Sequence, residues 1–262
     1  MRALDIAATG MMAQQTNVEI ISNNIANMNT TAYTRRRPEF SDLLYQNLRR
    51  VGATSSDVGT IVPTGIQLGL GVQTSAVYRI TEQGSLQNTD NTLDLAIQGK
   101  GYFKIQLPSG QFAYTRDGSF QLSDQGKIVT HDGYTVMPSV TVDPNATGIS
   151  IDASGDIMET LDGQVTPTKV GQFTITTFPN EAGLQATGNN MFTETPASGT
   201  PRDSTAMQPG YGSVLQGFLE TSNVNVVSEV TNLISAQRAY EMNSKVIQAS
   251  DEMLSTVNQM KS

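Results

Sequence analysis

Few side chains in this sequence are of the types that carry out chemistry, and their spacing does not assemble a reactive centre. His131 is the only histidine, which excludes a catalytic or metal site built from several histidines. Cysteine is absent, so disulfides, cysteine-ligated zinc and thiol catalysis are excluded as well. His131 lies in the turn sequence THDGY, where a surface turn residue is the simpler interpretation.

Carboxylates could support acid–base hydrolysis or calcium binding, and aspartates are frequent in the middle of the chain. Most of them stand beside Gly, Asn or Thr in turn sequences, and none shows the Asp-x-Asp-x-Asp spacing of a calcium loop. The sequence QGKGYF over residues 98–103 lacks the spacing of a phosphate-binding loop and is interpreted as a tight turn that opens a strand. We therefore expect no catalytic residues, no cofactor and no metal. These aspartates include Asp90, Asp94, Asp117, Asp124, Asp132, Asp152, Asp156 and Asp162.

Basic side chains gather at one place, which holds 5 of the 16 Lys and Arg residues. Acidic residues lie among them, and the chain carries a formal net charge of −8, opposite in sign to most nucleic-acid-binding proteins. We expect no nucleic-acid partner. Either the cluster is a solvated loop, or its guanidinium groups contact acidic residues of neighbouring copies of the chain. The residues are Arg35, Arg36, Arg37, Arg49 and Arg50.

Two long helices are predicted, one at each end of the chain, because apolar residues recur there every seven positions. The first covers residues 3–28 and the second residues 223–260, with Ser222 or Asn223 as its cap. The seam of the first helix contains Leu4, Met11, Val18 and Ile25 with Ala7, Gln14, Ile21 and Met28. The seam of the second contains Val226, Leu233, Tyr240, Ile247 and Leu254 with Ala236, Asn243, Ser250 and Val257.

Between the helices the pattern changes to short alternating runs separated by turn sequences such as RDG, SDQG and HDG. This pattern is typical of an antiparallel β domain. The predicted fold class is α+β, with three parts. Residues 1–33 and 223–262 form a paired, coiled-coil-like helical domain, residues 34–71 form an extended connector, and residues 72–222 form an inserted antiparallel β domain.

The first helix is unusual because residues 1–33 contain only Arg2, Asp5 and Glu19 as charged side chains. A helix with one buried stripe normally carries charges on its other face. Its end is rich in asparagine, with Asn23, Asn24, Asn27 and Asn29. These amides either bond between helices in a multi-helix assembly, or belong to the end of an intramolecular hairpin. The residues alone leave both interpretations open.

The chain contains no run of 18 apolar residues, so no membrane insertion is expected. Its first residues lack the pattern of a cleaved secretory signal, because Asp5 interrupts them and two glutamines follow soon after. A cytoplasmic protein and a protein exported by another route both fit this composition.

Three separated motifs resemble the bacterial flagellar rod and hook family. They are ISNNIANMNTTAYTRRRPEF near the start, LDLAIQGKGYFKI in the centre and ETSNVNVVSEVTNLISAQRAYEMNSKVIQASDEML near the end. Residues 46–63 resemble an extra stretch that rod members carry and hook members typically lack. Ala32 stands where the family commonly has glycine. Because a positive φ is costly for alanine, this departure predicts a differently shaped helix exit.

The resemblance implies a structural subunit of the rod, located in the flagellar basal body where the rod crosses the periplasm. The paired helices would form the inner tube of a rigid helical polymer around an export channel, and the tube would transmit torque from motor to hook. The stretch 46–63 would wedge between subunits and stiffen the tube. Alternatives are a sibling proximal rod or hook subunit, or a β-domain enzyme acting in the periplasm.

The implied partners are further copies of the chain, proximal rod and hook-side subunits, the rod cap, the surrounding ring proteins and the type III export apparatus. Both helices are expected to be largely disordered in the free monomer and to fold on assembly. The connector arginines named above would contact neighbouring subunits. The residues expected to pack between subunits are Leu4, Met11, Val18, Ile21, Asn24, Ile25, Asn27, Met28, Val226, Leu233, Ala236, Tyr240, Asn243, Ile247, Leu254 and Val257.

Overall fold

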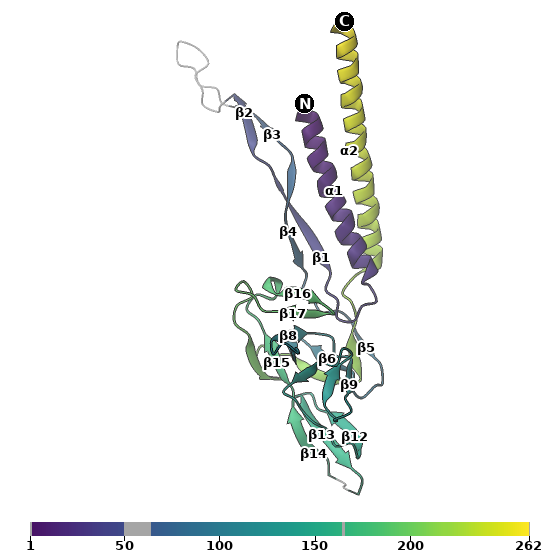
Figure 1. The fold of residues 1–262 in the computed structure, drawn as a ribbon. Coiled ribbons are helices and arrows are strands. Elements are labelled where there is room, and N and C mark those ends of the chain that lie inside the picture. Colours follow the sequence, from purple (N-terminus) through teal and green to yellow (C-terminus); the bar gives the residue numbers. More distant parts are fainter. Residues whose placement is uncertain (1, 50–63, 164–165, 262) are drawn as a thin grey trace. The chain divides into compact units, whose positions relative to one another are not determined.

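The protein has an α+β fold with a helix at each end and β strands between them, which confirms the predicted class (Figure 1). The computed structural model describes residues 2–49, 64–163 and 166–261. Helix α1 spans Arg2–Ala26, helix α2 spans Val226–Lys261, and a short 3-10 helix, η1, spans Glu181–Gly183.

The described strands fall into a group near the N-terminus and a larger group that follows it. The first group is β1 Arg36–Asp42, β2 Tyr45–Arg49, β3 Ile66–Gly69 and β4 Val72–Arg79. The second group begins with β5 Leu86–Asn88, β6 Leu95–Gln98, β7 Tyr102–Gln106, β8 Phe112–Thr115, β9 Phe120–Leu122, β10 Ile128–Thr130, β11 Thr135–Met137 and β12 Ala146–Ile151. It continues with β13 Asp156–Leu161, β14 Thr168–Gln172, β15 Thr174–Thr177, β16 Gln185–Gly188, β17 Met191–Thr193, β18 Arg202–Thr205, β19 Ser213–Gln216 and β20 Phe218–Glu220.

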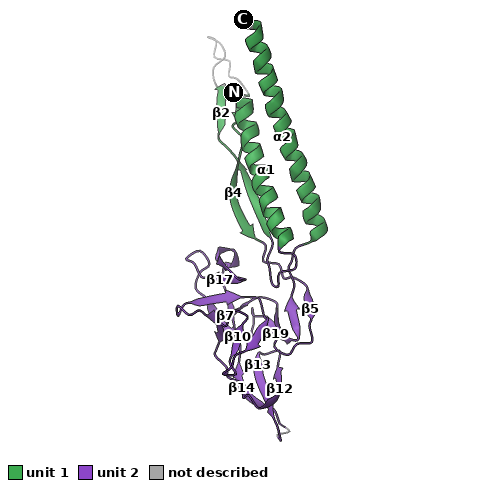
Figure 2. Cartoon of the chain, turned by 45° about the vertical axis from the view of Figure 1, so that its right-hand side comes forward, with its two compact units in different colours: residues 1–26, 36–79, 225–262 green, residues 27–35, 80–224 purple. Residues whose placement is uncertain are grey.

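The chain folds as two compact units (Figure 2). The helical unit comprises residues 1–26, 36–79 and 225–262, and the β unit comprises residues 27–35 and 80–224. The boundaries of the two compact units fall at other residues than the domain limits predicted from the sequence pattern. The difference arises because residues 27–35 are hydrogen-bonded within the β unit, whereas β1 and β4 pack with the helices.

In the helical unit, α1 lies between α2 on one side and the paired strands β1 and β4 on the other (Figures 1 and 2). Gly10 allows close approach to α2, because a Cβ there would lie 2.9 Å from Asn243 Nδ2. On the strand side, the hydroxyl of Thr9 accepts a hydrogen bond from the Val72 amide at 3.4 Å. Contacts on two sides explain why α1 carries so few charges.

In the part that the structure describes, the segment predicted as an extended connector is largely a β ribbon. Strand β1 pairs antiparallel with β4, from Arg36 opposite Arg79 to Asp42 opposite Val72, with a bulge between Glu39 and Phe40. Strand β2 pairs antiparallel with β3. Of the stretch 46–63, residues 50–63 lie outside the described residues. The ribbon was missed because its partner strand β4 was assigned to the β domain.

The β unit is built around a nine-stranded sheet with the strand order β16-β17-β8-β7-β11-β10-β9, to which β15 and β18 are joined beside β7. The described strand pairs of this sheet are antiparallel, as the turn-separated runs predict. Strand β7 alternates strictly: Phe103 enters the main core with Phe120 and Phe173, whereas Tyr102 packs with Phe178 in a second cluster. A separate sheet has the order β12-β13-β14.

The end of α1 and the start of α2 each differ by two or three residues from the sequence prediction. Helix α1 ends at Ala26 rather than residue 28, and α2 begins at Val226 rather than residue 223. The cap of α2 is Asn225, whose Oδ1 accepts a hydrogen bond from the Ser228 amide at 3.1 Å. Neither Ser222 nor Asn223 serves as the cap, because Asn223 has other partners, described below.

Candidate assembly surfaces

The predicted packing residues lie at three levels of burial. Ile21, Asn24 and Ala236 are buried within the helical unit. The half-buried residues are Leu4, Met11, Val18 and Ile25 of α1, Leu233, Asn243, Ile247 and Leu254 of α2, and Asn27 in the β unit. The exposed residues are Met28, Val226, Tyr240 and Val257. Their contacts with other subunits stay a prediction, and the exposed ones are the residues with surface left to bury.

Two polar residues of the α2 seam are buried, of which Ser250 was predicted to lie in the seam and Glu229 was missed. Glu229 is only 5% exposed and Ser250 only 2%. Both fall in the column of Ala236 and Asn243, since Glu229 precedes Ala236 by seven positions and Ser250 follows Asn243 by seven. The heptad spacing therefore contained the signal for Glu229, but its charge suggested a solvent-facing position.

The asparagine at the end of α1 is engaged within its own chain. Asn24 Nδ2 donates to the Arg36 carbonyl at 2.8 Å, and Asn24 Oδ1 accepts from the Arg36 amide at 2.9 Å. Asn24 Nδ2 also donates to Glu229 Oε2 at 3.4 Å. Asn24 thus imitates a strand partner for the first residue of β1 and joins the helix pair to the ribbon, which supports the intramolecular interpretation at this position.

Helix α2 exposes apolar side chains in two rows outside its seam. Near its start, Val227, Val230 and Ile234 are exposed, with Val227 78% exposed. Farther along, Met242, Val246, Met253 and Met260 follow one another at intervals of four and seven residues on one side of the helix. A third row, with Arg238, Lys245 and Glu252 seven residues apart, is charged. The helix therefore presents apolar surface that neither α1 nor the ribbon covers.

The connector arginines differ in their surroundings. Arg35 pairs with Glu82 at 3.5 Å, and the Arg37 guanidinium lies 5.1 Å from the ring centre of Tyr78 and donates a hydrogen bond to its hydroxyl. Arg36 is exposed, with its backbone held by Asn24. Arg49 ends β2, and Arg50 lies outside the described residues. Arg36 and Arg37 thus project from the start of β1, and their contact with neighbouring copies stays a prediction.

Residues 27–35, here called the strap, follow α1 directly but belong to the β unit. The Ala32 amide donates to the Glu220 carbonyl at 2.8 Å, and Asn190 Nδ2 donates to the Thr31 carbonyl at 3.1 Å. Ala32 adopts a φ of 55° and is buried. Ala32 therefore adopts the left-handed conformation although it is costly for alanine, because the surrounding bonds fix the strap.

The strained alanine leads to a stability prediction. Replacing Ala32 by glycine is expected to raise the free energy of unfolding of the β unit by about 0.5–1 kcal/mol, because glycine removes the left-handed strain. The matched control is Ala96→Gly in β6, a buried strand position, which is expected to lower it by about 1 kcal/mol. Urea unfolding of the full chain measures both. Equal losses at the two positions would show that Ala32 is not strained.

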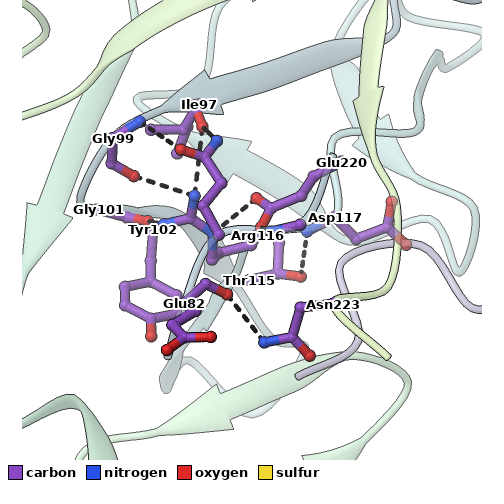
Figure 3. A network of polar contacts seen from close by, with 12 residues as sticks. Glu82, Ile97, Gly99, Gly101, Tyr102, Thr115, Arg116, Asp117, Glu220 and Asn223 are labelled. Carbon is purple, nitrogen blue, oxygen red and sulfur yellow. Dashed lines mark hydrogen bonds and ion pairs between the residues drawn. The ribbon is translucent and has the colours of Figure 1, made fainter. Parts of the chain in front are cut away.

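A buried ion pair joins distant segments of the β unit (Figure 3). Arg116 Nε donates to Glu220 Oε2 at 2.8 Å, and the two side chains are 9% and 3% exposed. The guanidinium also donates to the carbonyls of Ile97, Gly99 and Gly101 at 3.0–3.2 Å. The other Glu220 oxygen accepts from the Gly84 amide at 3.0 Å. Every bond therefore stays within one folded unit, which indicates a structural rather than a catalytic role.

Other ionisable groups of the β unit form more exposed pairs or have a shifted pKa. Lys104 lies 2.7 Å from Asp203 and over the Phe112 ring. Burial raises the pKa of Asp203, but hydrogen bonds from Lys104 and Thr176 outweigh it, so the net pKa is lowered. Burial, followed by the charges of Glu194 and Asp203, raises the pKa of Tyr114 to about 12. His131 lies in its turn 3.5 Å from Asp132 and is half exposed.

Comparison with known proteins identifies the chain. Three family models match it in order: "Flagella basal body rod protein" over residues 4–34, "Flagellar hook protein FlgE/F/G D1 domain" over 96–159, and "Flagellar basal body rod FlgEFG protein C-terminal" over 215–260. The Flagellar basal-body rod protein FlgG of Caulobacter vibrioides is 57% identical over 262 residues, the whole of both chains. Proteins of the same name from Agrobacterium fabrum and Bacillus subtilis are 52% and 37% identical, over at least 98% of each chain.

A β unit inserted between terminal helices with exposed apolar rows, together with these matches, defines a structural component of the flagellum rather than an enzyme. Neither described helix combines the length and hydropathy needed to cross a lipid bilayer. The chain belongs to the flagellar basal-body rod protein family, and it is a structural protein of the basal-body rod.

Proposed function

We propose that this chain is a distal rod subunit that assembles through its helical unit into a rigid tube, with α1 and α2 paired in a coiled-coil-like manner. The tube transmits torque from motor to hook and encloses the export channel. The observation that carries the proposal is the apolar surface left on α2, from Val227 at its start to Met260, 76% exposed, at its end. Monomeric soluble proteins rarely expose large apolar patches, so apolar rows without a partner on one helix favour association.

The seam of α2, its second apolar row and its charged row suggest how neighbours are arranged. The seam packs on α1, the row from Met242 to Met260 packs on a neighbouring copy, and the charged row with Arg238, Lys245 and Glu252 faces water, which suits the wall of a channel. Methionine adapts its shape readily and fits a contact repeated around a tube. The predicted packing residues and the arginines Arg36 and Arg37 would complete the contacts between copies.

The relatives named FlgG and the stretch 46–63 favour a distal rod subunit over a proximal rod or hook subunit. In this proposal that stretch lies between subunits and stiffens the tube. Proximal rod and hook-side subunits, the rod cap and the ring proteins are the proposed neighbours. In this proposal the type III export apparatus delivers the chain to the rod, which crosses the periplasm.

Electron microscopy of the purified chain at high concentration tests the proposal. The intact chain is expected to form tubes, whereas a chain that ends at residue 224 is expected to stay monomeric, because it lacks the α2 rows. Circular dichroism of the dilute intact chain is expected to show little helix, since assembly supplies the burial that orders the helices. Tubes from both chains, or full helicity in the dilute monomer, would contradict the proposal.

A further inference from the structure

We propose that Asn223 sets the register of the β1–β4 ribbon and the starting point of α2 from within the β unit, before the helices are ordered by assembly. The inference rests on the proposed function in one respect, that the helical unit becomes ordered with assembly. Its evidence is a set of hydrogen bonds among the strap, the segment that follows β4 and the segment that precedes α2, all inside the β unit.

The side chain of Asn223 uses both ends of its amide on backbone groups of two other segments. Its Nδ2 donates to the carbonyls of Ile80 and Glu82, each at 2.9 Å. Its Oδ1 accepts from the Arg35 amide at 2.7 Å. The Asn223 backbone amide also donates to the Tyr33 carbonyl at 3.3 Å. One residue therefore joins three separate segments, and Figure 3 shows its bond to Glu82.

These bonds meet at the base of the ribbon. The Ile80 amide donates to the Arg35 carbonyl at 2.9 Å, next to the first ribbon pair, Arg36 opposite Arg79. Asn223 bonds the amide of Arg35 and the carbonyl of Ile80, so it fixes which residues face each other where the ribbon begins. A slip of one residue in a strand pair would turn every following side chain to the opposite face.

The same bonds fix where α2 begins. Asn223 lies two residues before the cap Asn225 and three before Val226, the first residue of α2. The strap is held independently by Glu220 and Asn190, neither of which lies in the helical unit. The bonds that hold Arg35 and Ile80 therefore come from the β unit, whereas Asn24 of α1 bonds the next residue, Arg36. Holding these chain ends together in the free chain lowers the entropy lost when the ribbon and the helices form.

Amide hydrogen exchange on the dilute, monomeric full chain tests the inference. In the unmodified chain, the amides of Arg35 and Ile80 are expected to be protected, whereas those of α1 and α2 exchange freely. Asn223→Ala is expected to reduce protection at Arg35 and Ile80 by about 100-fold, since three side-chain hydrogen bonds are lost. The amide of Ile175 in the main sheet reports whether the β unit stays folded.

Two further variants keep the test decisive. Asn225→Ala removes only the helix cap and is expected to leave both protected amides unchanged. Asn223→Asp keeps an acceptor for Arg35 but loses both donors, so it is expected to reduce protection at Ile80 even if Asn223→Ala does not fold. In assembly assays both Asn223 variants are expected to need a higher concentration to form tubes than the unmodified chain.

Free exchange of Arg35 and Ile80 in the unmodified monomer would overturn the inference. Undiminished protection in a folded Asn223 variant would overturn it too. A failure of the proposed function looks different, because the unmodified chain would then form no tubes while the exchange pattern around Asn223 still held.

Discussion

Replacing Arg116 by methionine is expected to lower the free energy of unfolding of the β unit by about 3–5 kcal/mol. Methionine fills much of the same volume but leaves the Glu220 carboxylate buried without its cation. It also removes the donors to three carbonyls, those of Ile97, Gly99 and Gly101. Urea unfolding of the full chain, followed by tyrosine fluorescence, measures the loss.

The controls separate the buried pair from surface charge. Lys104→Met breaks the more exposed pair with Asp203, whose side chains are 17% and 39% exposed, and is expected to cost less than about 1 kcal/mol. The double variant Arg116→Met with Glu220→Leu removes both buried charges and is expected to recover part of the loss. A loss at Arg116 no larger than that at Lys104 would show that the pair does not hold the β unit together.

Replacing Val246 by glutamate is expected to raise the concentration needed for tube formation by at least about 100-fold. The variant loses the burial of valine, about 1.5–3 kcal/mol, and places a charge in the proposed contact. Glutamate forms helices at least as well as valine, so α2 itself is not weakened. Sedimentation of the assembled fraction against total concentration measures the change.

The neighbouring residue supplies the control. Lys245→Gln changes the net charge by the same amount but lies in the charged row of α2, and it is expected to shift the assembly concentration less than about threefold. Equal effects of the two variants would show that net charge, rather than the apolar row, governs assembly.

The helices and the β domain could be predicted because their signals are local. Seven-residue spacing identified both helices to within three residues at each end, and alternating runs identified the sheet. The ribbon could not be predicted in the same way. The paired residues of β1 and β4 are separated by 30 to 43 positions in the sequence, from Asp42 with Val72 to Arg36 with Arg79, and the β1 sequence RRPEFSD has no clear alternation.

The role proposed for Asn223 could not be predicted from the sequence either, because its partners lie far away along the chain. Its partner Arg35 lies 188 positions away, and its bonds go to backbone groups, which any residue could supply. Asparagine before a helix therefore indicated a cap, the common local use. The burial of Glu229 was not predicted because a carboxylate is rarely buried, although its heptad position agrees with its burial.

The strap and the ribbon make the backbone pass between the two units four times, at residues 26/27, 35/36, 79/80 and 224/225. Most neighbouring domains are connected by a single flexible linker, about which they can swivel. Here a twisting load has four covalent paths acting in parallel, so no single peptide carries it alone. If the rod carries torque as proposed, the twist within each subunit is shared by these four passages of the chain.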